Sequence, residues 1–148
     1  MGALREEPLK RGSDNLGVEP EMERFKPLLN YILVELRVIL AKNEGYMLSW
    51  DVVNLRSTGD DLIRLAHEAH PQLAKVEHRV LHRSLRDAGL GMRMRALEVQ
   101  KRRLEERDKA YFREVHEALK NICEKIETGE YYRALVKVRD SKMTPNRP

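Results

Sequence analysis

The chain has 148 residues, of which 41% are hydrophobic and 35% are charged, and its formal net charge is +4 at pH 7. Such a length is ordinary for one domain and buries about two thirds of the unfolded surface without needing a disulfide or a metal. The single cysteine, Cys123, cannot form an internal disulfide, and no apolar run approaches the roughly 18 residues of a membrane span. We therefore expect an intracellular protein, cytoplasmic or nuclear, with no membrane partner.

Few aromatic and β-branched residues are present, which favours helices over sheets. We expect one helical domain over residues 20–142. A charged, glycine-containing arm over residues 1–19 precedes it, and a fraying tail over residues 143–148 follows it. The predicted fold is all-α, with five or six helices.

The most apolar stretch is LLNYILVELRVILA, residues 28–41, and we expect the other helices to pack around it. At 3.6 residues per turn its polar side chains fall on one narrow strip, so the helix must be covered on more than one side. We predict a central buried helix over residues 27–42 that ends near Gly45. Glu35 interrupts its apolar part. Three alternatives explain a carboxylate there: a buried ion pair with an arginine, which is favoured, an interface with another chain, and a catalytic group.

Turn-forming and capping residues divide the remainder of the chain. Ser49 is a good N-cap, Gly59 follows two polar residues in a predicted turn, and Pro71 stops a helix. Gly89 ends the next helix and Gly91 turns the chain, after which nothing breaks a helix for nearly forty residues. The predicted helices after the central one span residues 50–56, 60–70, 72–88, 92–128 and 131–140. We expect the long 92–128 helix to pack by its second half and to project by its charged first half.

Positive charge is concentrated in the third quarter of the chain. Residues 79–103 hold eight basic and two acidic side chains, and the 72–88 helix has apolar residues on one side and basic residues on the other. A basic amphipathic helix packed by its apolar side presents a row of cations that can each meet a phosphate. The predicted nucleic-acid-binding residues are Lys75, Arg79, Arg83, Arg86, Arg93, Arg95, Lys101, Arg102 and Arg103.

These features favour a non-enzymatic nucleic-acid-binding protein, either a helix-turn-helix-like regulator or a helical subunit of a nucleoprotein complex. The sequence does not separate DNA from RNA. Two alternatives for the basic face stay open: it is simply solvated, or it docks an acidic protein. The competing function is a helical adaptor that binds proteins through exposed apolar positions on the long helix and around Trp50, Tyr46, Tyr131 and Tyr132. The long helix also suggests a homodimer or a larger complex, because a helix that is apolar over only part of its length often pairs with another chain.

Four histidines lie at helical spacings that can place two imidazoles on one metal ion. They are His67, His70, His78 and His82. No cysteine is near them in sequence, and His82 falls among cations, so we expect no metal and no cofactor; a metal-dependent enzyme is a minor alternative. Cys123 follows His116 by two helical turns, but a buried cysteine acting as a small hydrophobe is favoured over a nucleophilic pair.

Overall fold

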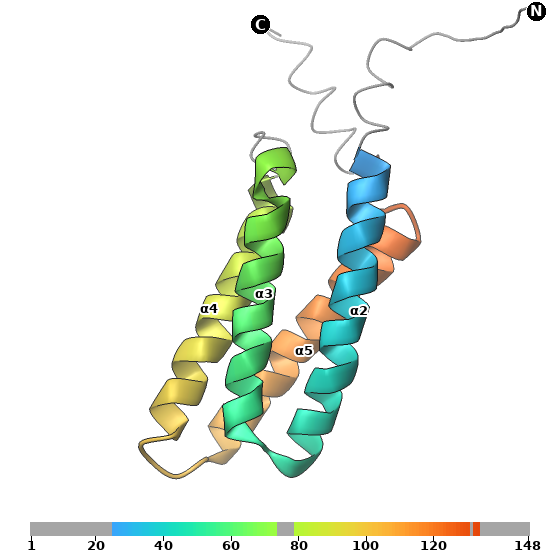
Figure 1. Ribbon diagram of the computed structural model, residues 1–148. Helices are drawn as coiled ribbons and strands as arrows, with labels where there is room; N and C mark the ends of the chain where they lie inside the picture. Colours follow the sequence, from blue (N-terminus) through green and yellow to red (C-terminus); the bar gives the residue numbers. More distant parts are fainter. Residues whose placement is uncertain (1–24, 74–78, 131, 134–148) are drawn as a thin grey trace, which may run out of the picture.

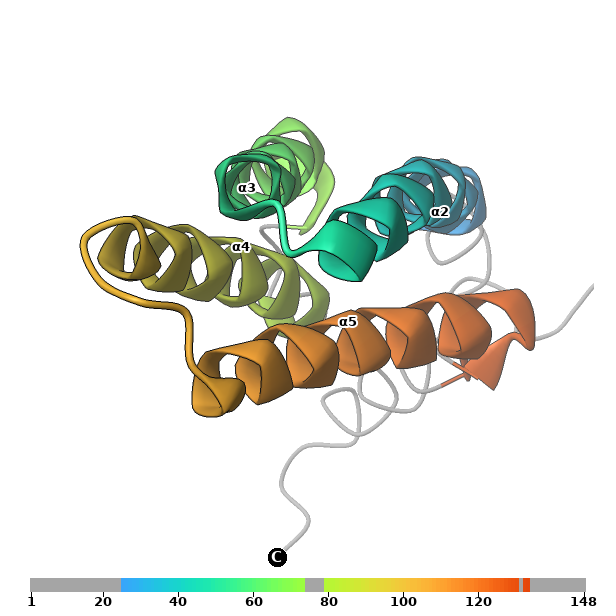
Figure 2. The same cartoon turned by 90° about the horizontal axis from the view of Figure 1, so that it is seen from below.

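The computed structural model describes residues 25–73, 79–130, 132 and 133, which form an all-α bundle (Figure 1). Four helices make up this described part: α2 over Phe25–Ser49, α3 over Val52–Leu73, α4 over Arg79–Val99 and α5 over Glu106–Glu127. In both views α3 lies between α2 and α4. Helix α5 crosses obliquely behind the other helices in Figure 1 and runs below them in Figure 2. The all-α class is confirmed. The expected arm, the tail and most of the 131–140 helix fall outside the described residues.

Helix α2 supplies the largest share of the core, but the prediction that it is the central helix was wrong, because α3 lies between α2 and α4. Its buried positions recur at helical spacing: Leu29, Ile32, Leu33, Leu36, Ile39 and Leu40. They pack against α3 and α5, where Leu62 and Phe112 are completely buried. The helix is therefore covered on more than one side, as predicted, while Val34 and Val38 on its outer side are about half exposed.

The end of α2 lies later in the chain than the sequence predicted. The helix continues through Gly45 to Ser49, and Trp50 then takes a left-handed conformation with φ of 53°. The N–H of Asp51 donates to the carbonyl of Tyr46 at 2.9 Å, and that of Trp50 to the carbonyl of Met47 at 3.3 Å. Together these bonds make a Schellman-type C-cap, with tryptophan at the position that usually holds glycine.

Asp51 begins the next helix, so the predicted cap at Ser49 and the separate 50–56 helix were wrong. Its carboxylate accepts a hydrogen bond from the backbone N–H of Asn54 at 3.2 Å and another from the amide side chain of Asn54 at 2.7 Å. An aspartate that accepts from a first-turn N–H is a strong N-cap. From Val52, α3 runs without a break to Leu73, past the predicted turn at Gly59 and the predicted stop at Pro71.

Helices α3 and α4 touch through two glycines, which explains why these residues do not end helices here. A Cβ atom added to Gly59 would lie 2.7 Å from the carbonyl oxygen of Gly89, and one added to Gly89 would lie 2.7 Å from that of Gly59. No side chain can enter such a contact, because backbone atoms cannot move aside. Gly91 has a similar role, since a Cβ there would collide with the hydroxyl of Tyr111 on α5. The predicted helix end at Gly89 and turn at Gly91 were therefore wrong.

The predicted 92–128 helix is two helices, α4 and α5, separated by residues 100–105. Its first half does not project into solvent as a charged helix. Instead, Val99 is buried at the end of α4, and Asp108 is buried in the first turn of α5. The reason for the break lies in the contacts of that aspartate.

Candidate nucleic-acid interface

Helix α4 packs by one side and presents arginines on the other. Its inner side buries Leu81, Leu85, Met92 and Ala96. The opposite side carries Arg83, Arg86 and Arg93, all exposed, which we call the α4 basic row. At 1.5 Å per residue the row extends about 15 Å along the helix.

The α4 basic row makes only weak ion pairs. Arg86 lies 3.7 Å from the carboxylate of Asp87, and Arg93 lies 3.7 Å from that of Asp60. All four of these side chains are about half exposed. Exposed pairs at such distances contribute little stability and are readily exchanged for another anion.

Two other predicted site residues lie outside what the structure describes. Lys75 falls in the 74–78 segment, which is not described. Arg79 is the first residue of α4, and only its place in the helix is described. Both therefore stay predictions. Lys101 and Arg103 are exposed in the 100–105 loop, immediately after α4.

The remaining two arginines converge on a buried carboxylate. The side chain of Asp108 is 0% exposed. Arg102 donates to both of its oxygens, at 2.8 Å and 2.9 Å, and Arg95 donates to Oδ1 at 2.9 Å. The backbone N–H of Glu105 donates to Oδ2 at 2.8 Å, so Asp108 also serves in the capping box of α5. Four donors thus surround one carboxylate.

These contacts favour the charged forms of Asp108 and Arg102. The guanidinium of Arg102, helped by the N–H of Glu105 and by Arg95, holds the pKa of Asp108 well below its usual range despite burial, which acts the other way. The same pair raises the pKa of Arg102 further above its usual range. Arg95 additionally lies over the ring of Tyr111, with its guanidinium carbon 4.6 Å from the ring centroid. Arg95 and Arg102 therefore hold the turn between α4 and α5 together.

The sequence contained a signal for this arrangement. Glu105 and Asp108 have the three-residue spacing of a capping box, and a clear apolar stripe follows them. Glutamate is not among the preferred N-cap residues, which weakened the signal. A charged segment with no glycine or proline then looked like continuous helix.

Apolar side chains share the outer side of α4 with the basic row. Met94 is 67% exposed and Val80 is 64% exposed, while Leu90 lies between Arg86 and Arg93 and is partly exposed. Apolar side chains such as these do not bind phosphates. The outer side of α4 is therefore mixed in character, basic along one edge and apolar along the other.

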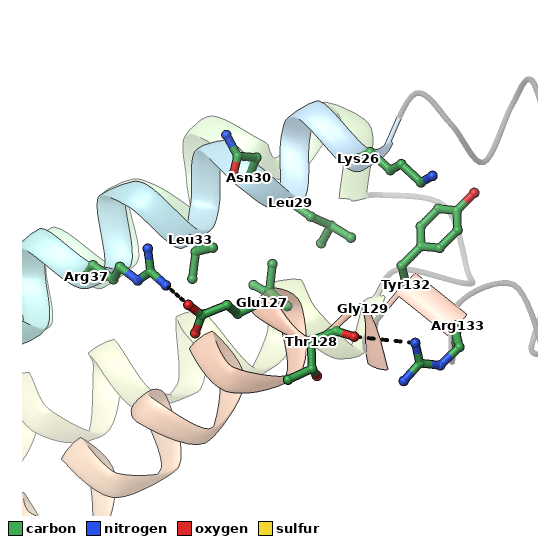
Figure 3. A pocket seen from close by; sticks show the side chains of 11 residues that line it. Lys26, Leu29, Asn30, Leu33, Arg37, Glu127, Thr128, Gly129, Tyr132 and Arg133 are labelled. Carbon is green, nitrogen blue, oxygen red and sulfur yellow. Dashed lines mark hydrogen bonds and ion pairs between the residues drawn. The ribbon is translucent and has the colours of Figure 1, made fainter.

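A pocket of about 560 Å³ lies between the start of α2 and the end of α5 (Figure 3). Leu29 and Leu33 form an apolar wall, and Lys26, Arg37 and Arg133 supply cations at the rim. The cations are engaged within the chain, as the salt bridge from Arg37 to Glu127 illustrates. Sequence reasoning missed this pocket, because its walls come from residues about one hundred positions apart.

Cys123 and His116 line a second pocket, of about 320 Å³, between α2 and α5. Burial raises the pKa of the Cys123 thiol and lowers the pKa of His116. Both shifts oppose the thiolate and imidazolium that a cysteine nucleophile uses. His116 instead pairs with the buried amide of Asn43, whose Nδ2 lies 3.0 Å from Nδ1 of the ring. An amide nitrogen only donates, so this ring nitrogen is the acceptor of the contact.

The histidine cluster is described only in part. His67 is exposed on α3 and His82 is partly buried on α4, while the side chains of His70 and His78 lie outside the described residues. Within the described part of the chain, no group of three His, Cys, Asp or Glu side chains could hold a metal ion. Over the same residues, no helix is long and apolar enough to cross a membrane.

Two cationic features therefore stand out on the described surface: the α4 basic row and the rim of the pocket between α2 and α5. No protein-family model matches this chain, and neither does any curated protein or solved structure.

Proposed function

We propose that this protein is a non-enzymatic nucleic-acid-binding protein that contacts phosphates through the α4 basic row. The observation that supports this proposal is the exposure of Arg83, Arg86 and Arg93 on one side of a single helix whose other side is buried. A packed helix holds its side chains at fixed spacing, so the cations need not be gathered on binding. Each strand of duplex DNA carries one phosphate per about 3.4 Å of axis, so a row about 15 Å long spans about four phosphates of one strand.

The loop after α4 adds to this surface. Lys101 and Arg103 are exposed there. Arg95 and Arg102, which bind Asp108, act as positioning residues that hold the loop in place. In this proposal they support the interface rather than contact phosphates, and the direct contacts come from the α4 basic row, Lys101 and Arg103.

The packing of α3 against α4 favours a helical subunit over a helix-turn-helix regulator. In a helix-turn-helix, the two helices meet at about 90–120° so that the second can enter the major groove. Here α3 and α4 lie side by side along their lengths (Figure 1), in contact at Gly59 and Gly89. We infer that α4 lies against the phosphate backbone with its outer side and does not read bases from within a groove.

Fluorescence anisotropy across a salt series tests the proposal. The protein is titrated into labelled duplex and single-stranded oligonucleotides, alongside a variant with Arg83→Gln, Arg86→Gln and Arg93→Gln. A matched control, Arg107→Gln with Lys120→Gln and Lys125→Gln, removes the same charge from exposed positions on α5. We expect the first variant to lower the slope of log K against log salt by about 2–3, and the control to leave the slope nearly unchanged. Equal slopes for the two variants would contradict the proposal.

A second candidate function is a helical adaptor, and the exposed Leu90 and Met94 favour it. A partner helix with acidic and apolar sides could place its carboxylates on the α4 basic row and its apolar residues on these two side chains. Leu90→Ser with Met94→Ser separates the two functions. Loss of binding to a synthetic acidic amphipathic peptide, with unchanged oligonucleotide binding, would assign this apolar edge to a protein partner.

A further inference from the structure

The outer side of α2 carries an uncharged stripe that faces solvent. It consists of Tyr31, Val34, Val38, Ala41 and Gly45, which we call the outer α2 stripe. All five residues are exposed, and the three largest side chains are 43%, 48% and 49% exposed. At 100° per residue they fall within about 80° of the helix circumference, and they span about 21 Å. Four helical turns without a charge are unusual on the solvent side of a helix.

Gly45 has no explanation within the described chain. A Cβ added to Gly59 or Gly89 would strike the facing backbone, whereas a Cβ added to Gly45 would meet nothing within 4 Å. Glycine within a helix is destabilising relative to alanine, and here no neighbour in the chain requires it. A second helix packed closely over the stripe would require it. The glycine therefore indicates an occupant.

We propose that this occupant is a second copy of the chain, with the two α2 helices antiparallel and crossing near Val38. The sizes of the side chains carry the argument. Tyr31 and Val34 precede the centre by seven and four residues, whereas Ala41 and Gly45 follow it by three and seven. Antiparallel pairing therefore places the large residues of each chain against the small residues of the other. Such a stripe is complementary to itself, as a two-fold symmetric interface requires.

Charge at the edge of the stripe selects the same arrangement. Glu35 and Lys42 flank the stripe on one side, at equal distances before and after a centre between residues 38 and 39. Neither forms an ion pair with another described residue. A two-fold axis at that centre brings Glu35 of each chain beside Lys42 of the other, making two equivalent pairs. Parallel helices in register would instead turn this edge of the stripe toward the opposite edge of the partner, so Glu35 and Lys42 would not meet.

A contact from α3 holds Tyr31, the largest side chain of the outer α2 stripe, in place. The hydroxyl of Tyr31 donates to the carboxylate of Glu68 at 3.0 Å, so the ring is held on the surface of the free chain. An anchor that is already oriented loses less conformational freedom on binding. This dimer replaces the one expected from the 92–128 helix, because that helix is not continuous. The inference is independent of nucleic-acid binding, since α2 and α4 present different outer surfaces.

The mass of the full chain in solution tests the proposal. Sedimentation velocity from about 1 to about 300 µM should show a reversible dimer, with a dissociation constant on the order of micromolar to tens of micromolar, because a single helix pair makes a small interface. Val38→Glu, which places two carboxylates at the two-fold axis, should give a monomer throughout. Val53→Glu, at an exposed position on α3, is the matched control and should still dimerise. A monomer at every concentration of the unmodified chain would overturn the proposal.

Charge exchange tests the orientation. Glu35→Lys and Lys42→Glu, made separately, should each weaken the dimer at least tenfold, and the double variant should restore it. Mixing the two single variants should give a heterodimer, because one chain then carries two lysines and the other two glutamates. If none of these changes alters the dissociation constant of the dimer, the interface does not lie at the outer α2 stripe.

Gly45→Leu separates loss of the dimer from loss of the fold. Leucine is a better helix former than glycine and has open space at this position in the single chain. The variant should keep or raise the melting temperature measured at low concentration, where the chain is monomeric. It should nevertheless fail to dimerise. A Gly45→Leu chain that dimerises as well as the unmodified one would count against close packing at this residue.

Discussion

Two groups of arginines lie on or near α4, and their surroundings differ. Arg95 and Arg102 meet at the buried carboxylate of Asp108, and both keep less than a third of their side-chain surface in water. Arg86 and Arg93 are about half exposed and have only 3.7 Å contacts with exposed carboxylates. The residue type is the same in both groups. What differs is whether a buried anion lies within reach, and this decides whether a cation holds the fold or is available to a partner.

The difference separates structural charge from functional charge. A buried carboxylate cannot lose its cations without a large loss of stability, since it would keep an uncompensated charge. An exposed arginine can exchange one anion for another at little cost. The first group should therefore be sensitive to substitution and to pH, and the second group only to added polyanions and salt.

The largest effect should follow from removing the buried anion. Asp108→Ala leaves two guanidinium groups without their partner and removes the acceptor of the Glu105 N–H. We expect it to lower the free energy of unfolding by about 2–4 kcal/mol, because both arginines stay partly hydrated. Urea denaturation measures the change. Glu106→Ala, at an exposed neighbouring position, should change it by less than about 0.5 kcal/mol; equal effects of the two variants would contradict a structural role for Asp108.

The close packing of α4 against α3 should be the feature next most sensitive to substitution. Gly89→Ala puts a methyl group 2.7 Å from the carbonyl oxygen of Gly59, so α3 and α4 must separate. We expect a loss of about 1–3 kcal/mol, the usual cost of overpacking. Gly45→Ala, measured in the dilute monomer, should instead be neutral or stabilising by up to about 1 kcal/mol. Differential scanning calorimetry measures the change in stability of each variant. If both variants lost stability, Gly45 would not differ from Gly89 in the way stated here.

Arg102→Gln compared with Arg86→Gln tests the two arginine groups directly. Arg102 donates to both oxygens of Asp108, whereas Arg86 has one long exposed contact. We expect the first substitution to lower the urea midpoint clearly, though by less than Asp108→Ala, since Arg95 still pairs with the carboxylate. The second should leave the midpoint within error. The reverse order would show that Asp108 is not what holds Arg102.

Acid titration should report the buried pair. Because the pKa of Asp108 is lower in the folded chain than in the unfolded chain, this carboxylate contributes its full stability above about pH 4 and loses it as pH falls further. The stability difference between the unmodified chain and Asp108→Asn should be constant from pH 7 to about pH 5 and shrink below about pH 4. A difference that does not change with pH would argue against a charged Asp108.

A smaller pH effect should come from His116 and occupy a separate range. Burial lowers its pKa in the folded chain, so the unfolded chain binds the proton first. The associated stability is complete above about pH 6.5 and declines as pH falls below it. Of the charged groups around the ring, Glu44 and Glu117 oppose this shift and Lys120 adds to it. In His116→Gln the free energy of unfolding should no longer change between about pH 5 and pH 7. The loss of stability below about pH 4 that Asp108 causes should remain.

Local patterns predicted the features that depend only on neighbours along the chain. The apolar spacing of residues 28–41 predicted a buried helix there, because a helix repeats every 3.6 residues wherever it lies. The same reasoning placed Arg83 and Arg86 opposite the buried side of α4. The all-α class followed from composition and spacing in the same way.

Features that depend on a facing element were decided only by the tertiary structure. Glycine predicts either a turn or a close approach, and only the meeting of α3 with α4 shows that Gly59 and Gly89 allow a close approach. Likewise, a run of charged residues without a breaker favours a continuous helix. Only the convergence of Arg95 and Arg102 on Asp108, across thirteen and six residues respectively, shows why the chain turns there. Sequence periodicity determined which side of each helix is buried, and tertiary contacts determined where the helices end and which cations remain exposed.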